Sequence, residues 1–209
     1  MDYSAIFFDW DGVITDSINI KADAFAELYR GYGPEIEKKV VDYHFLNSGI
    51  SRFEKIKYFH REFLRKDINE AELISLGNQF SDIVFDAVVC ADFIPGAIET
   101  LQDEYARGTN LFVVTGTPTD EMCRIAEARG LSRYFSRILG SPGNKTEIIA
   151  RLISEFTLKK RECLMIGDAM EDYRAAANNG IDFLGIVTAS DSFRVEFPAG
   201  TTIRNEVRI

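Results

Sequence analysis

Two aspartates separated by one residue, Asp9 and Asp11, follow a short apolar run and directly precede Gly12. Side chains at positions i and i+2 of an extended strand point to the same face. Both carboxylates should therefore emerge together where the strand ends and the glycine lets the chain turn. Two like charges this close repel one another unless a cation or a shared proton compensates them. The pair predicts chemistry that depends on a divalent metal ion.

A second pair of acids, Asp168 and Asp172, follows another strand-like run. Their spacing would place both carboxylates on one face of a helix. The four aspartates together form a set of oxygen ligands that suits a hard cation such as Mg²⁺. An alternative for Asp172 is a place in the first helical turn, where a negative charge favours the helix dipole.

Three further residues suit the oxygens of a phosphoryl group. Thr115 and Gly116 follow a buried-looking strand and precede a helix, where backbone N–H groups bind anions. Lys145 stands at another helix start and supplies a full positive charge. The alternatives are that Thr115 only caps a helix and that Lys145 is an ordinary solvated lysine.

The elements that must hold these groups change character along the chain. A strand at about residues 3–9 is followed by a helical stretch from about 20 to 88, with capping boxes expected at Ser51 and Asn69. Strands near 111–114, 137–139, 163–166 and 183–187 then alternate with helices that begin near Gly96, at Thr117 as N-cap, and at Asn144. This order predicts an α/β fold with a Rossmann-like parallel sheet flanked by helices. The predicted core is 1–15 and 90–209, and the all-helical insert is 16–89.

Composition limits the function classes. The 209 residues are 46% apolar, and no stretch approaches the roughly 20 apolar residues of a membrane span. The start of the chain shows no targeting signature and the three cysteines are widely spaced, so we expect a cytoplasmic protein with free thiols. A net charge of −9 argues against nonspecific binding to nucleic acid. We expect no nucleic-acid or membrane partner, and a monomer or weak homodimer.

Four segments, in chain order, resemble the haloacid dehalogenase superfamily, in the branch of phosphoglycolate phosphatases and β-phosphoglucomutases with a helical cap. The resemblance covers nearly the whole chain, and the helical insert looks like the small cap of that family. The segments are Asp9-Trp10-Asp11-Gly12-Val13-Ile14-Thr15-Asp16-Ser17, Thr115-Gly116-Thr117, Lys145, and Gly167-Asp168-Ala169-Met170-Glu171-Asp172.

The resemblance implies a mechanism. Asp9 would attack phosphorus and form a phosphoaspartate, and Asp11 would first protonate the leaving oxygen and then take a proton from water. Mg²⁺ would be bound by Asp9, the backbone carbonyl of Asp11 and Asp168, with Asp172 acting through water or from behind the direct ligands. Dehalogenases and ion-pumping ATPases that resemble this fold lack an acid at the position of Asp11, so phosphoester chemistry is favoured.

The insert would contribute substrate contacts. Arg52 and Lys55 lie one turn apart at a helix start, similar to an arrangement that contacts the substrate in sugar-phosphomutase relatives. The alternative for both is a solvated basic face. Lys21 and the two glycines, Gly12 and Gly116, complete the expected substrate site. Many relatives, including mutases, have a histidine at the position of Lys21, and this difference counts against mutase activity.

The sequence therefore predicts a Mg²⁺-dependent phosphatase that hydrolyses a small phosphomonoester, such as a sugar phosphate or a related metabolite, through an aspartyl phosphate. A sugar phosphomutase that uses the same phosphoaspartate chemistry is the alternative. A protein that keeps the fold only to bind a ligand is a third possibility, and the complete set of acids with Lys145 speaks against it.

Overall fold

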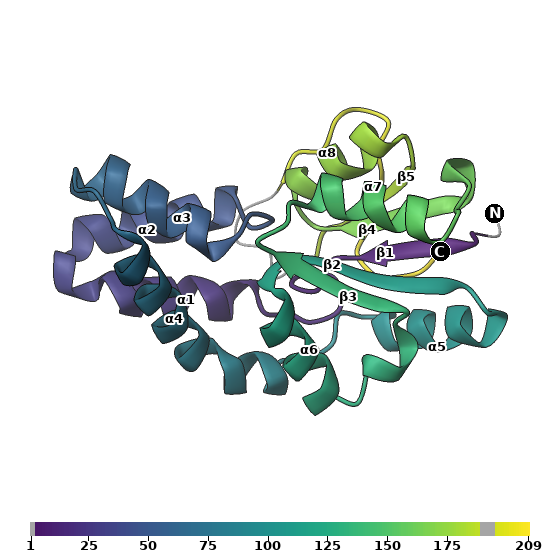
Figure 1. The fold of residues 1–209 in the computed structure, drawn as a ribbon, viewed down its shortest axis with the longest axis horizontal. Helices are drawn as coiled ribbons and strands as arrows, with labels where there is room; N and C mark the ends of the chain where they lie inside the picture. Colours follow the sequence, from purple (N-terminus) through teal and green to yellow (C-terminus); the bar gives the residue numbers. More distant parts are fainter. Residues whose placement is uncertain (1–2, 189–194) are drawn as a thin grey trace.

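The centre of the molecule is a six-stranded sheet in the order β3-β2-β1-β4-β5-β6, in which every neighbouring pair is parallel. The structure is a computed structural model, and it describes residues 3–188 and 195–209. The α/β fold with a parallel sheet flanked by helices is confirmed (Figure 1). The strands are β1 (Ala5–Phe8), β2 (Asn110–Pro118), β3 (Arg137–Ser141), β4 (Cys163–Gly167), β5 (Asp182–Ile186) and β6 (Thr202–Arg204).

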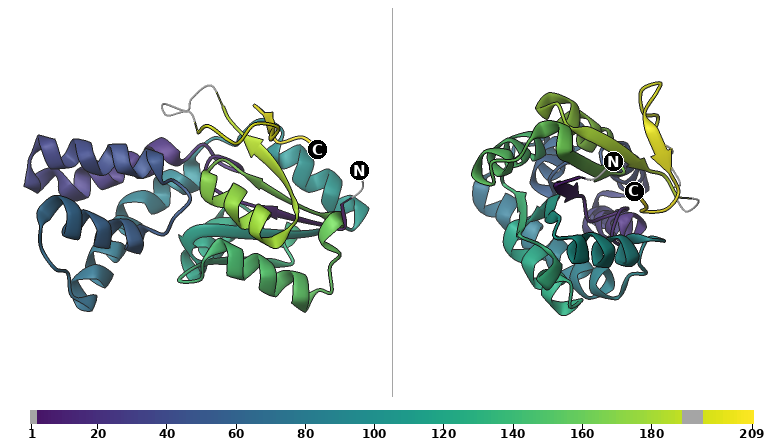
Figure 2. Two further views of the ribbon diagram at one scale, coloured as in Figure 1. Left: turned by 90° about the horizontal axis from the view of Figure 1, so that it is seen from above. Right: turned by 90° about the vertical axis from the view of Figure 1, so that its right-hand side faces the viewer.

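Strand β1 is fully buried. Its two edges pair with β2 and β4, and helices cover both faces of the sheet. Ile6 and Phe8 pack toward the side of α5 (Ala97–Arg107) and α6 (Thr119–Ala128). Ala5 and Phe7 pack toward the side of α7 (Lys145–Glu155) and α8 (Met170–Asn179). The end-on view in Figure 2 shows these two helical layers around the sheet. A strand with apolar residues at every position follows directly from this double cover.

The predicted helix starts were only partly right. Asn144 caps α7 by accepting the Glu147 N–H at 2.9 Å, and the reciprocal bonds of Asn69 and Glu72 begin α4. The N-cap predicted at Thr117 is wrong. Strand β2 continues to Pro118, which pairs with Ser141 of β3, and the helix begins one residue later. Strand β6 was not predicted, because its three residues are exposed and carry no buried pattern.

An all-helical cap follows β1 in the sequence and lies beside the sheet (Figure 1). Its helices are α1 (Ile18–Tyr29), α2 (Pro34–Leu46), α3 (Arg52–Tyr58) and α4 (Glu70–Cys90). The sequence did not separate α2, which begins with Pro34 after Gly33 at a φ of 92°. Ser51 caps α3 by accepting the Phe53 N–H at 3.2 Å instead of through a capping box with Glu54. The cap boundaries at residues 16 and 89 stay a prediction.

The two chain crossings between cap and core lie side by side. The Asp16 N–H donates to the Asp92 carbonyl at 2.9 Å, and the Ile94 N–H donates to the Ile14 carbonyl at 3.1 Å. From the core, Arg129 donates to the carbonyls of Val88 and Val89 at the end of α4. These bonds satisfy carbonyls that the helix end leaves without partners.

Helix α4, with 21 residues, is long and apolar enough by composition to cross a membrane. This is weak evidence, because core helices of water-soluble proteins meet the same criterion. Phe80, Val84 and Val88 of α4 are buried against other parts of the protein. The apolar composition of α4 is therefore explained by its packing against the rest of the protein.

Candidate functional site

The predicted site residues meet at the carboxyl ends of three adjacent strands. Asp9 directly follows β1, Thr115 lies near the end of β2, and Asp168 directly follows β4. These strands are neighbours in the sheet, with β1 between the other two. The carboxyl edge of an open parallel sheet is where such folds bind ligands.

Three buried carboxylates form a compact group. One oxygen from each of Asp9, Asp168 and Asp172 lies within 4.8 Å of the others. The Lys145 ammonium donates to Asp9 at 2.7 Å and to Asp172 at 2.6 Å. The sequence predicted Asp168 and Asp172 on one face of a helix. This is wrong for Asp168, because α8 begins only at Met170. The group forms because the loop after β4 turns Asp168 toward the first turn of α8.

The electrostatics of this group favour a cation. Burial, followed by the charges of Asp9 and Asp172, raises the pKa of Asp168 well above its usual value. Burial alone would lower the pKa of Lys145, but the charges of Asp172 and Asp9 raise it instead. One ammonium faces three carboxylates, so negative charge is in excess. A hard divalent cation fits this donor set and would offset the repulsion.

The Asp11 carboxylate lies outside that group and pairs with the cap. It accepts hydrogen bonds from the Lys21 ammonium and, at 2.6 Å, from the Ser17 hydroxyl. Lys21 also donates to the Thr117 hydroxyl at 2.8 Å, which joins α1 to β2. Burial raises the pKa of Asp11, but the charge and hydrogen bond of Lys21 outweigh it and leave the pKa below its usual value.

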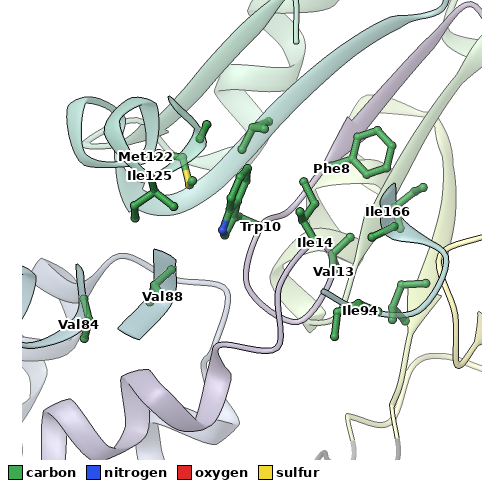
Figure 3. Close-up of a cluster of buried hydrophobic side chains, with 14 of the residues drawn as sticks. Phe8, Trp10, Val13, Ile14, Val84, Val88, Ile94, Met122, Ile125 and Ile166 are labelled. Atoms are coloured by element: carbon green, nitrogen blue, oxygen red, sulfur yellow. The ribbon is translucent and has the colours of Figure 1, made fainter. Parts of the chain in front are cut away.

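The Trp10 side chain, between the two aspartates in the sequence, points away from the carboxylates and into the apolar core. Figure 3 shows its ring in the apolar cluster beside Met122 and Ile125, and it is fully buried. Asp9 accepts the Trp10 N–H at 2.7 Å, which holds the carboxylate at the strand end. The alternation predicted for an extended strand therefore separates the core residue from the two acids.

Two glycines are required by close approaches. Gly12 has a φ of 75°, and a Cβ there would lie 2.7 Å from an oxygen of Asp168. A Cβ at Gly116 would lie 3.1 Å from the carbonyl of Ile50 in the cap. Beside it, the Thr115 side chain is buried and its oxygen accepts the Thr117 N–H at 3.3 Å. The glycines let the cap and the acidic loop approach the strand ends.

A cavity of about 30 Å³ lies between cap and core, and we call it the cap–core cavity. Because Arg52 of the cap is paired with Glu121 of the core, the cap lies closed over this cavity. Its walls include Asp9, Asp11, Lys21, Arg52, Lys55 and Thr115. Lys145 borders a second cavity of about 40 Å³ next to it, together with Thr115 and Gly116.

Arg52 borders the cap–core cavity, but its guanidinium is engaged elsewhere. It donates to Glu121 of the core helix α6 at 2.5 Å and to Ser81 of α4 at 2.6 Å. Ser81 in turn donates to Glu121 at 2.5 Å, and the guanidinium lies 4.7 Å from the centre of the Phe80 ring. The contact that the sequence predicted between Arg52 and a substrate stays a prediction.

Lys55 also borders the cavity, and its surroundings are different. Its ammonium is 2.9 Å from His44 Nδ1 and 3.4 Å from the Ser48 carbonyl oxygen. Burial, followed by the charge of Lys21, lowers the pKa of Lys55 to about 7. A solvated basic face is wrong for Arg52 and Lys55, since both are buried.

Sequence reasoning missed four polar residues around the site: Ser17, His44, Thr117 and Glu121. Ser17 lies within the first motif, but no role was assigned to it. Thr117 was interpreted as a helix cap. His44 and Glu121 lie on helices without any local motif, and only the tertiary structure brings them to Lys55 and Arg52.

The sequence of this chain is similar to a family of hydrolases and to several named enzymes. Residues 3–180 match the haloacid dehalogenase-like hydrolases. A phosphoglycolate phosphatase of Vibrio parahaemolyticus is 27% identical over 194 residues, which covers 88% of this chain and 84% of that protein. A 5'-nucleotidase of Pseudomonas aeruginosa is 26% identical over 203 residues, which covers 88% and 82% of the two chains.

Solved structures share the fold. A β-phosphoglucomutase from Clostridium difficile superposes with a TM-score of 0.75 at 22% identity, covering 89% of this chain and 85% of that one. CbbY from Rhodobacter sphaeroides, in complex with xylulose-1,5-bisphosphate, gives 0.76 at 19% identity and covers 98% and 94%. The match over residues 3–180 extends across both the cap and most of the core. The chain is therefore an enzyme of the haloacid dehalogenase-like hydrolase family, as its four motifs predicted.

Proposed function

We propose that this protein is a Mg²⁺-dependent phosphatase that hydrolyses a small phosphomonoester through an aspartyl phosphate on Asp9. The observation that carries the proposal is the buried group of Asp9, Asp168 and Asp172 with Lys145 donating to two of them. The excess negative charge suits a divalent metal, and the ammonium suits a phosphoryl oxygen. The phosphatase and nucleotidase names of the relatives support the same reaction type.

In this proposal each residue has a defined task. Asp9 attacks phosphorus in line with the leaving oxygen, and water then hydrolyses the acyl phosphate. Lys145 and the Thr115 hydroxyl stabilise charge on the phosphoryl oxygens. Asp9, the backbone carbonyl of Asp11, Asp168 and Asp172 would hold Mg²⁺, which neutralises charge on the phosphoryl group when bound.

Asp11 is the proposed acid and base. With Lys21 and Ser17 bound to it and its pKa lowered, Asp11 is a carboxylate in this arrangement. That form can take a proton from the attacking water. Donating a proton to the leaving oxygen first requires that the contact with Lys21 loosen when substrate enters. Lys21 therefore sets the proton state of Asp11 in the closed enzyme.

A phosphomutase is the second candidate. The closed cap–core cavity of about 30 Å³ would shield an aspartyl phosphate from bulk water, as a mutase requires. The fold of the β-phosphoglucomutase from Clostridium difficile agrees with either activity. Release of inorganic phosphate distinguishes the two, because a mutase returns the phosphoryl group to a sugar. We further propose a cytoplasmic enzyme that acts on small soluble metabolites without nucleic-acid or membrane partners, as a monomer or weak homodimer.

The test is phosphate release from a panel of phosphorylated metabolites and from p-nitrophenyl phosphate, with Mg²⁺ and with a chelator. We expect Mg²⁺-dependent turnover that falls by on the order of a thousandfold or more in Asp9→Asn, because the amide cannot form the acyl phosphate. The exposed Asp23→Asn on α1 is the matched control and should keep full activity. Substantial turnover by a folded, pure Asp9→Asn enzyme would contradict the proposal.

A further inference from the structure

The end of the sheet opposite to the proposed catalytic residues has a hollow of about 500 Å³, which we call the β5–β6 hollow. Its walls include Tyr3 before β1, Tyr173 on α8, Asp182 and Phe183 at the start of β5, and Thr202 at the start of β6. The proposed catalytic acids follow strand ends and lie at the carboxyl edge of the parallel sheet, whereas this hollow lies at the amino edge. It is therefore separate from the cap–core cavity.

The topology of the sheet explains why the hollow exists. Helix α8 packs on β4 and β5, and β6 continues the sheet on the far side of β5. A turn with Gly200 at a φ of 90° leads into β6, and in it the Thr201 N–H donates to the Pro198 carbonyl at 3.1 Å. The hollow lies between the side of α8 and this turn. Its volume is within the range of sites that bind small organic molecules.

Three half-buried aromatic side chains line the hollow, from segments far apart in the sequence: Tyr3, Tyr173 and Phe183. The ring centroids of Tyr173 and Phe183 are 5.5 Å apart, and the two ring planes meet at 89°. Two perpendicular rings form a corner at which a ligand can contact both. The electron-rich faces of aromatic rings attract cations, and several rings around one cation form a cage.

The charge of the hollow is negative. Of the described residues that line it, only Asp182 is charged. The Tyr3 hydroxyl donates to Asp182 Oδ2 at 3.0 Å, and within residues 3–188 and 195–209 no basic side chain forms an ion pair with Asp182. Burial, followed by this hydrogen bond, raises the pKa of Tyr3 to about 12, so the hydroxyl remains a donor. The cap–core cavity and the cavity beside it each have lysine in their walls instead.

These walls discriminate among classes of ligand. An anion would meet the Asp182 carboxylate without a positive side chain to compensate the repulsion. A hard metal ion needs several oxygen ligands, and one carboxylate among aromatic rings does not supply them. A neutral apolar molecule would use the rings alone. An organic cation uses both the rings and the carboxylate.

We infer that the β5–β6 hollow binds a small organic cation, whose alkylated ammonium group lies against the rings of Tyr173 and Phe183 and pairs with Asp182. An alkylated ammonium suits the site better than a bare one, because its methyl groups contact the rings and it is less strongly hydrated. The site is independent of the proposed phosphatase function.

The test compares choline with 3,3-dimethylbutan-1-ol, a neutral molecule of the same shape in which carbon replaces nitrogen. NMR titration of the unaltered protein follows the amide resonances of residues 181–183 and 199–202. We expect these resonances to shift with choline, and its dissociation constant to be on the order of tenfold lower than that of the alcohol. Tighter binding of a peptide with a trimethylated lysine than of choline would overturn the assignment to a small molecule.

Variants of the walls test the two kinds of contact separately. Asp182→Asn keeps the shape of the side chain and should raise the dissociation constant of choline by about tenfold, with little change for the alcohol. Tyr173→Leu keeps an apolar wall without a ring and should also weaken choline more than the alcohol. The exposed Asp103→Asn and Tyr105→Leu, both on α5, are the matched controls and should change neither ligand. Thermal unfolding checks that each variant is folded.

Three results would overturn the inference. One is equal binding of choline and the alcohol to the unaltered protein, which would make the hollow a nonselective apolar surface. Another is an unchanged affinity for choline in folded Asp182→Asn and Tyr173→Leu. The third is the absence of shifts around the hollow at about 50 mM choline. None of these measurements uses turnover, so they remain decisive whether or not the proposed phosphatase activity is found.

Discussion

Lys145 in the core and Lys55 in the cap are both buried at the closed site, and their environments are opposite. Lys145 has two carboxylates within 2.7 Å and a raised pKa. Within the part of the chain that the structure describes, Lys55 has only neutral hydrogen-bond partners, and its pKa is lowered to about 7. Near pH 7 the core lysine is therefore charged, whereas the cap lysine is close to its titration midpoint.

The difference separates two kinds of site. The core carries its own counter-charges, so in the proposed function its geometry is prepared before a phosphomonoester arrives. In the cap, the described residues supply no ion-pair partner for the Lys55 ammonium. In the proposed function the strand ends determine the reaction type and the cap helices the choice of substrate, and the following variants test this division.

Of the variants that test this comparison, Lys145→Met should have the largest effect. The variant removes the ammonium that faces Asp9 and Asp172, and kcat/KM should fall by on the order of 10²–10³ for every substrate, because stabilisation of phosphoryl charge is lost. Steady-state kinetics on 2-phosphoglycolate and p-nitrophenyl phosphate measure this. The exposed Lys160→Met is the control. A loss confined to one substrate would show that Lys145 contributes to selectivity, contrary to the comparison.

Asp168→Ala should come next, with Mg²⁺ affinity reduced by roughly 10- to 100-fold. The same variant removes one of three buried like charges, so the metal-free protein should be more stable than its metal-free parent. Thermal unfolding with and without Mg²⁺ measures both effects. If Mg²⁺ supports activity and stabilises the two proteins equally, Asp168 is not a metal ligand.

Arg52→Ala and Glu121→Gln should each lower turnover by about tenfold or less. Each breaks the ion pair between α3 and α6, so cap closure weakens for all substrates alike. In the double variant the two losses should be less than additive, which a double-mutant cycle measures. A loss for 2-phosphoglycolate alone in Arg52→Ala would instead make Arg52 a substrate ligand, as the sequence predicted.

The smallest effect concerns stability as a function of pH. The pKa of Lys55 is about 7 in the folded protein and near its usual 10.5 when unfolded. Between these values the unfolded chain binds more protons, so stability should rise with pH through this window by roughly 1–4 kcal/mol. Urea unfolding from pH 6.5 to 10 should show this rise in the parent and in Lys57→Met. It should be smaller in Lys55→Met, and identical pH profiles in all three proteins would contradict the assigned environment of Lys55.

The part of the site that could be predicted rests on local pattern. The apolar run before Asp9 is strand β1, and Asn144 begins α7 as its spacing from Glu147 predicts. Because parallel strands end at one edge, placing the strands also brought their terminal residues together. The predicted cap at Thr117 failed because pairing between β2 and β3, a tertiary effect, extended the strand past it.

The cap contacts could not be predicted in the same way. Arg52 and Glu121 are 69 positions apart, and neither belongs to a motif that names the other. His44 lies on α2, a helix whose separate existence was missed. A lysine in a helical pattern has the same local sequence whether it is solvated or buried, so only packing distinguishes Lys55 from the exposed Lys57.

The adjoining crossings at Asp16 and Asp92 have a consequence for engineering. Because the backbones meet at a 2.9 Å hydrogen bond, the two ends of the cap lie next to each other on the core. A segment attached in this way can be exchanged as a cassette, since its replacement needs only two neighbouring ends. We expect that grafting another helical cap between these points would transfer the substrate preference of that cap to an unchanged core.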